Sequence, residues 1–138
     1  MSMESKDNLK ENIRRRNITP RSVFQTVKNS INGIKSYARE GKSIIIYLAC
    51  LIIEVLMGFV YNINGLEWIL IICLLGIILA IELLNTAIEA TCDAITKEYN
   101  SLIKIAKDCG SAATFVIFIM GLLLNVIIFL PKIVELLK

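Results

Sequence analysis

The sequence predicts an all-α membrane protein with three transmembrane helices and an amphipathic surface helix before them. The 138-residue chain is 56% hydrophobic and only 20% charged, and a soluble domain of this length would struggle to bury so much apolar surface. Three apolar runs are each long enough to cross a bilayer. Before them, apolar residues recur at helical spacing among polar ones. The bilayer is therefore the expected solvent for most of the chain.

The first part of the chain divides into a tail and a helix. Residues 1–18 are polar and highly charged, without a sustained apolar period, and are expected to form a disordered basic tail. Thr19-Pro20 fits a helix start, so the surface helix is predicted over residues 19–41. Its apolar face would lie on the cytoplasmic membrane surface, or alternatively against a partner protein. That face comprises Val23, Val27, Ile31, Ile34 and Tyr37.

Three apolar runs follow, over Ser43–Val60, Trp68–Leu84 and Ala112–Leu130. Each is about the ~17–25 residues that a helix needs to cross about 30 Å of hydrocarbon. The turn between the first two is short, so they should form a tight hairpin. The second helix is expected to continue beyond its apolar part as a cytoplasmic extension. The predicted transmembrane helices then cover 43–60, 68–92 and 112–130, within one domain over residues 19–138.

The distribution of basic residues predicts the orientation. Ten of the 15 Lys and Arg residues lie between Lys6 and Lys42, three lie in the polar stretch before the third span, and Tyr61–Glu67 has none. The positive-inside rule then places the N-terminus in the cytoplasm and the C-terminus outside. No aromatic interleaving or nucleic-acid motif accompanies the basic run, so no nucleic-acid partner is expected. The four cysteines form no C-x-x-C pair and histidine is absent, so no zinc site is expected.

A row of polar side chains interrupts the second apolar run. At 100° per residue, Glu82, Asn85, Glu89 and Asp93 fall within a sector about 80° wide on one helix. Because a carboxylate at membrane depth is costly, Glu82 is expected to be functional, the alternative being a hydrogen-bonding role near the interface. Such acids could hold Mg²⁺ and take a proton from a lipid hydroxyl. Downstream, Lys107 offers a cation for phosphate oxygens.

These residues carry a resemblance to a known family. The blocks Glu82-Leu83-Leu84-Asn85-Thr86-Ala87-Ile88-Glu89-Ala90, Asp93, Ala106-Lys107-Asp108 and Gly110-Ser111-Ala112-Ala113 resemble the prokaryotic diacylglycerol kinase family, which includes the undecaprenol kinases. The likeness runs from about Ser22 to Leu130. It implies a bacterial cell-membrane kinase that assembles as a homotrimer with active sites between subunits. It also implies transfer of the γ-phosphoryl group of ATP, with Mg²⁺, to a lipid hydroxyl.

The resemblance further implies roles for individual residues. Glu82 would be the general base and contact the lipid, and Glu89 would bind the metal near the nucleotide. Asn85 and Asp93 would support this polar site, and Ser111 would contact the lipid substrate. The residues implied to contact ATP, besides Glu89, are Asn29, Glu98, Tyr99, Asn100, Lys107 and Asp108.

The chain departs from the family pattern in several places. A second metal-binding glutamate of the family aligns with Gly41, so the neighbouring Glu40 is the candidate replacement. An aromatic residue expected near Asn29 is missing, and Glu54 in the first span has no family role. The N-terminal extension and the closing Phe129–Ile133 segment favour undecaprenol over diacylglycerol as substrate. The alternatives are a proton-coupled carrier using Glu54 and Glu82, and a non-catalytic membrane scaffold.

Overall fold

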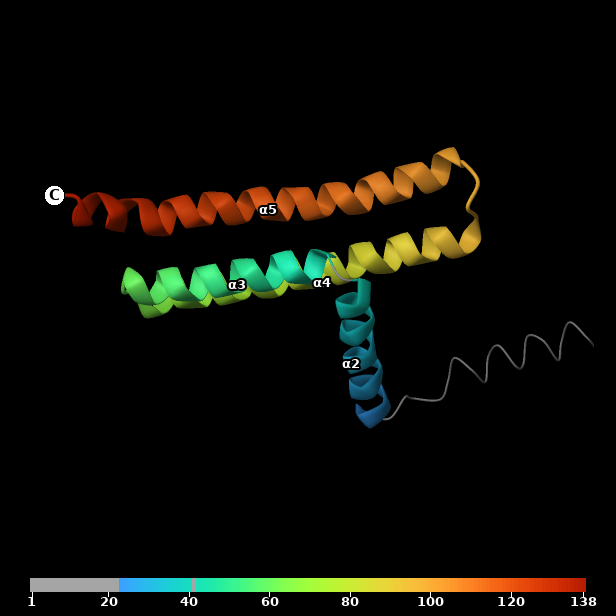
Figure 1. Cartoon of the computed structure of the whole chain (residues 1–138), viewed down its shortest axis with the longest axis horizontal. Coiled ribbons are helices and arrows are strands. Elements are labelled where there is room, and N and C mark those ends of the chain that lie inside the picture. The colour runs from blue at the N-terminus through green and yellow to red at the C-terminus, as the bar shows by residue number, and fades with distance from the viewer. Residues whose placement is uncertain (1–22, 41) are drawn as a thin grey trace, which may run out of the picture. The chain divides into compact units, whose positions relative to one another are not determined.

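The structure, a computed structural model, describes residues 23–40 and 42–138, apart from the side chains of residues 40 and 42 (Figure 1). It contains four helices: α2 (Val23–Glu40), α3 (Lys42–Val60), α4 (Gly65–Ile95) and α5 (Ser101–Leu136). The last three are long and apolar enough to cross a membrane. The predicted all-α fold class is thus confirmed. The predicted basic tail (1–18), the Thr19-Pro20 helix start and Gly41 lie outside the described residues.

The chain divides into two compact units, residues 1–35 and 36–138, and the boundary falls within α2. In the first unit, the described part of α2 exposes the apolar side chains Val23, Phe24, Val27, Ile31 and Ile34. Their helical spacing gives α2 one apolar face, as expected of a helix that rests on a membrane surface. The second unit contains all three long helices and is the part that bears the site.

Two asparagines shape the turn between α3 and α4. Asn62 adopts a positive φ of 46°, a conformation that asparagine tolerates better than most residues. Asn64 caps α4, because its Oδ1 accepts hydrogen bonds from the backbone N–H groups of Leu66 (2.9 Å) and Glu67 (3.0 Å). The Glu67 carboxylate in turn accepts from the Asn64 N–H at 2.7 Å. This reciprocal capping box fixes the start of α4.

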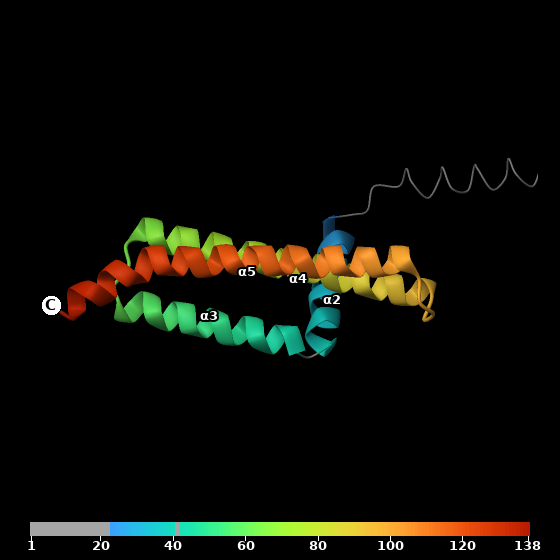
Figure 2. The same ribbon diagram turned by 90° about the horizontal axis from the view of Figure 1, so that it is seen from above.

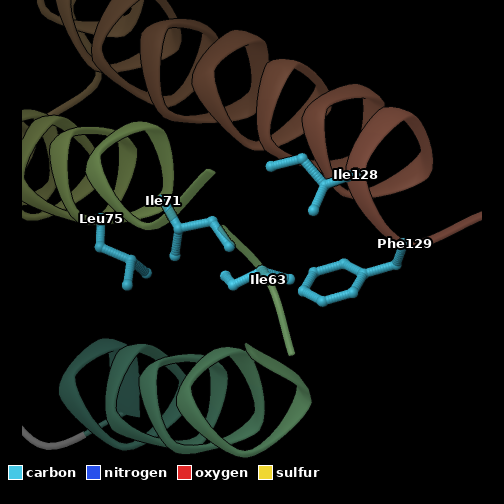
Figure 3. Close-up of a cluster of buried hydrophobic side chains, with 5 residues drawn as sticks. All are labelled: Ile63, Ile71, Leu75, Ile128 and Phe129. Atoms are coloured by element: carbon cyan, nitrogen blue, oxygen red, sulfur yellow. The ribbon is translucent and has the colours of Figure 1, made fainter. Parts of the chain in front are cut away.

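α4 is the central helix of the second unit. It runs alongside both α3 and α5 (Figures 1 and 2). The buried core near the hairpin consists of five apolar side chains from the turn, α4 and α5 (Figure 3): Ile63, Ile71, Leu75, Ile128 and Phe129. Gly58 permits the close approach of α3 to Trp68, since a Cβ there would lie 2.5 Å from the indole ring. Local packing therefore fixes the hairpin end of the unit.

Most other apolar side chains of α3, α4 and α5 face outward and are exposed. That arrangement is unfavourable in water and favourable in lipid. α4 has 31 residues and is about 46 Å long, which exceeds the roughly 30 Å of bilayer hydrocarbon. Its polar C-terminal turns can therefore extend beyond the hydrocarbon while the helix remains continuous. This continuity keeps the acidic residues on one helix.

Candidate functional site

The polar row lies on α4 without a break, because the helix runs from Gly65 to Ile95. Within it, Asn85 Nδ2 donates a hydrogen bond to Glu89 Oε1 at 3.1 Å. Asn85 Oδ1 is buried and accepts no hydrogen bond from the described residues. It lies directly against Gly110 of α5, where an added Cβ would collide with it. The small residue on α5 thus lets the two helices approach closely enough to hold the Asn85 amide beside Glu89.

Glu82 is half-buried at one end of an apolar groove. The groove has a volume of about 270 Å³ and is lined by α3, α4 and α5. Ser43 and Tyr47 of α3 line it together with Glu82, and Tyr47 Oη donates to the Leu75 carbonyl at 3.3 Å. A carboxylate at the end of an apolar groove is well placed to meet the polar end of an amphiphile.

Tyr37 is a neighbour of Glu82 that the sequence did not single out as a site residue. Only 2% of its surface is exposed, and its hydroxyl has no hydrogen-bond partner among the described residues. Burial, and secondarily the charge of Glu82, raise the pKa of Tyr37 above its ordinary value. The hydroxyl therefore keeps its proton at neutral pH and is available as a donor. Its place on the apolar face of the surface helix gave no sign of this.

A second pocket lies at the connection between α4 and α5 and has a volume of about 380 Å³. Five of the residues implied to contact ATP line it: Glu98, Tyr99, Asn100, Lys107 and Asp108. Asp93 of the polar row lines the same pocket. Residues from the end of α4, the connection and the start of α5 are thus brought together. We call this the connection pocket.

Ion pairs organise the connection pocket. Lys107 Nζ lies 2.6 Å from Asp93 Oδ1 and joins α5 to α4. Asp93 also pairs with Lys97 at 3.7 Å, and Asp108 pairs with Lys104 at 2.6 Å. Lys97 and Lys104 were not among the predicted site residues. Lys104 precedes Asp108 by four residues on α5, a spacing that could have identified the pair. Lys97 follows Asp93 by four residues but lies just beyond the end of α4.

The remaining predicted site residues are more dispersed. Ser111 is exposed on α5, next to the buried Gly110. Asn29 belongs to the unit of residues 1–35, where its Oδ1 accepts a hydrogen bond from Gln25 Nε2 at 2.9 Å. Glu40 ends α2 as part of the helical backbone, and its side chain lies outside the described residues. The nucleotide role of Asn29 and the metal role of Glu40 stay predictions.

The fit of Mg²⁺ depends on the available carboxylates. Among the described side chains, no cluster of three or more Asp, Glu, Cys or His residues could hold a metal by itself. Mg²⁺ usually binds one or two protein carboxylates together with substrate phosphates and water. Glu89 is exposed and hydrogen-bonded to Asn85, and it would be the carboxylate available as such a ligand. The donor set therefore fits an ion shared with a nucleotide.

The helices and the site together define a multi-pass membrane protein with a carboxylate-bearing polar site at one end of its apolar spans. A family model described as prokaryotic diacylglycerol kinase matches residues 28–129, and the chain belongs to that family. It is therefore a lipid kinase of a bacterial membrane.

Three relatives show how far the similarity extends. An undecaprenol kinase of Bacillus subtilis is 33% identical over 130 residues, which cover 94% of this chain and 99% of that protein. A diacylglycerol kinase of Haemophilus influenzae is 33% identical over 110 residues, or 78% of this chain and 92% of that protein. A diacylglycerol kinase of Pseudomonas aeruginosa is 58% identical over 45 residues, or 33% and 35% of the two chains.

Proposed function

We propose that this lipid kinase transfers the γ-phosphoryl group of ATP, in the presence of Mg²⁺, to the hydroxyl of undecaprenol at the cytoplasmic membrane face. The observation that carries the proposal is the position of Glu82, where the apolar groove meets the polar row of α4. A lipid hydroxyl at this point would lie beside a carboxylate while its hydrocarbon remained in apolar surroundings. Undecaprenol is favoured because the relative named for it matches nearly the whole chain.

Glu82 acts as the general base in this mechanism. It accepts the hydroxyl proton as the lipid oxygen forms a bond to the γ-phosphorus, and the bond from that phosphorus to the β,γ-bridging oxygen breaks to release ADP. Tyr37 can donate a hydrogen bond toward Glu82 or toward the lipid oxygen, since its own hydroxyl is otherwise unpaired among the described residues. The pair would orient the acceptor before transfer.

The nucleotide is held by the polar row and the connection pocket. Glu89 is the proposed metal ligand, with Asn85 fixing its carboxylate. When bound, Mg²⁺ would neutralise negative charge on the phosphates. Lys107 is held in place by Asp93 and can turn toward phosphate oxygens. The residues proposed to contact ATP in the pocket are Glu98, Tyr99, Asn100, Lys107 and Asp108. Asn29 is a further proposed ATP contact, and Glu40 is the candidate second metal ligand.

The site would be completed in a homotrimer with active sites between subunits. Glu89 is exposed in the single chain, which leaves it accessible to residues of a second copy. The proposed orientation places the N-terminus and the connection pocket in the cytoplasm, where ATP is available. Diacylglycerol is the second candidate acceptor, because relatives named as diacylglycerol kinases also match this chain.

A direct assay tests the proposal. Purified protein in mixed micelles receives labelled ATP, Mg²⁺ and either undecaprenol or diacylglycerol, and phosphorylated lipid is measured. Glu82→Gln should lower kcat by at least about 100-fold while still binding nucleotide, as expected for loss of a general base. Glu89→Gln should instead mainly raise the KM for Mg-ATP.

The control is Glu135→Gln, which makes the same chemical change at the other end of α5 and should behave like the parent. Parental turnover by Glu82→Gln would overturn the assignment of the base. A preference for diacylglycerol would reassign the substrate and leave the class of reaction intact.

A further inference from the structure

The apolar groove has a defined direction and length. α4 packs closely against both α3 and α5, whereas the backbones of α3 and α5 lie further apart among the described residues. The groove therefore has α4 as its floor and the other two helices as its walls. Its lining runs over Ser43–Glu54, Ile71–Glu82 and Thr114–Asn125. Each stretch covers eleven residue steps, about 16 Å along a helix axis.

A polar bridge crosses the groove at the end remote from Glu82. Asn125 Nδ2 of α5 donates a hydrogen bond to Glu54 Oε1 of α3 at 2.6 Å and another to the Gly121 carbonyl at 3.1 Å. Glu54 Oε2 is buried and has no partner among the described residues. A carboxyl and an amide at membrane depth are costly, and the proposed phosphoryl transfer uses neither of them. We call this pair the crossbar.

Resting on the proposed function, we propose that the groove binds the hydrocarbon chain of the lipid alcohol and that the crossbar sets how much of the chain it holds. The walls are mostly apolar, and the groove begins at the residue that would receive the hydroxyl. Its length is about half of the roughly 30 Å hydrocarbon layer, the depth of one leaflet. A cavity of this kind is unfavourable to leave empty. The hydrocarbon chain of a lipid whose hydroxyl lies at Glu82 would enter the groove from the Glu82 end and fill it.

The crossbar limits the chain for a physical reason. Hydrocarbon that separated the Asn125 amide from Glu54 would leave a buried carboxyl without its hydrogen bond, which is costly. The hydrogen-bonded side chains also block the path between α3 and α5. A chain longer than the groove must therefore turn out between the two walls into the bilayer. Carbon atoms beyond that point make no contact with the groove and should not affect recognition.

Two variants should change, in opposite directions, the length of lipid chain that the groove can hold. The double variant Glu54→Ala with Asn125→Ala removes the crossbar and lengthens the groove. Gly121→Leu fills part of it: a Cβ at Gly121 would lie in ordinary contact with Leu74 (3.5 Å) and Ile78 (3.8 Å), and the larger side chain would project further among the lining residues. Ile127→Leu changes an exposed residue of α5 outside the groove and is the control.

The measurement is kcat/KM for a series of prenols of increasing length at a fixed mole fraction in micelles. For the parent and the control, kcat/KM should rise with chain length and then level off. The double variant should level off at a longer chain and Gly121→Leu at a shorter one, each changing the long-to-short preference about tenfold or more. Unchanged profiles, or shifts of both variants in the same direction, would overturn the proposal.

Binding without catalysis separates this inference from the proposed function. A prenol carrying a photoreactive diazirine in its chain is cross-linked to the full-length protein without ATP, and the labelled peptides are identified by mass spectrometry. Labelling within residues 114–125 that unlabelled prenol competes away supports the groove even if no kinase activity is found. Labelling that phospholipid competes away equally well would assign the groove to bulk lipid and overturn the inference, whatever the kinase assay shows.

Discussion

The position of the Asn85 side chain depends on the absence of a side chain at Gly110. Its amide nitrogen holds Glu89, and its amide oxygen occupies the space that the absence of a Cβ at Gly110 leaves open. The orientation of a proposed metal ligand on α4 is thereby linked to a glycine on α5. In the sequence, Gly110 was noted only as part of the small-residue block that carries the family resemblance. The contact explains why a residue without a Cβ is needed at position 110.

Gly110→Ala should therefore weaken nucleotide binding. The added methyl would displace the Asn85 amide and break its hydrogen bond to Glu89, and loss of one hydrogen bond to a charged group is worth about 1.5–3 kcal/mol. We expect the KM for Mg-ATP to rise about tenfold or more. Gly76→Ala is the matched control, because a Cβ at Gly76 meets nothing within 4 Å. Equal KM values for the two variants would contradict this account.

At the scale of single helices, the sequence predicted how many helices there are and of what kind better than it predicted where each helix begins and ends. Hydropathy placed the third span at Ala112–Leu130, and α5 runs from Ser101 to Leu136. Hydropathy detects only the lipid-exposed part of a helix, whereas backbone hydrogen bonding continues into polar turns. Asn100, which begins α5 as its cap, is a residue type that favours this position and could have marked the start.

The pairing of side chains from different helices was harder to foresee. The polar row of α4 followed from helical periodicity alone, since all its members share one helix. The Glu54–Asn125 crossbar joins residues 71 positions apart, and the register of α3 against α5 is required to bring them together. Tyr37 likewise looked like one more apolar-face residue until its burial was known. These contacts depend on how the helices pack together, which local sequence patterns do not specify.

The Asn100 cap leads to a prediction about α5. Asn100 Oδ1 accepts hydrogen bonds from the backbone N–H groups of Leu102 (2.9 Å) and Ile103 (3.4 Å). Asn100→Ala should lower the free energy of unfolding by about 1 kcal/mol and loosen the connection pocket. Asn100→Ser retains a capping oxygen and should restore stability, as measured by thermal unfolding in detergent.

The same two variants separate capping from nucleotide contact. If Asn100 acts only as a cap, serine should also restore the KM for ATP. If the amide itself contacts ATP, serine should restore stability while the KM for ATP stays raised. An unchanged melting temperature for Asn100→Ala would show that the cap contributes little.

At the scale of the whole molecule, the charges and the proposed chemistry favour the same orientation. Lys97, Lys104 and Lys107 gather around the connection pocket, which we propose faces the cytoplasm, the compartment that contains ATP. At the other end, Lys132 pairs with Glu67 at 3.1 Å, and the hairpin has no basic residue of its own. The positive-inside rule therefore places the proposed site in the cytoplasm. A reversed orientation would separate the site from its nucleotide.

Cysteine accessibility tests this orientation. Starting from a chain whose four cysteines are replaced by serine, single cysteines are introduced at Asn62, Ser101 or Lys138, all exposed positions. In intact cells, a membrane-impermeant maleimide should label Asn62→Cys and Lys138→Cys, and should label Ser101→Cys only after the membrane is permeabilised. Equal labelling of the three in detergent shows that each thiol can react. If Ser101→Cys is labelled in intact cells while the other two are protected, the connection pocket faces outward. Glu82 could not then serve a kinase that takes ATP from the cytoplasm, even if every contact within the site is correct.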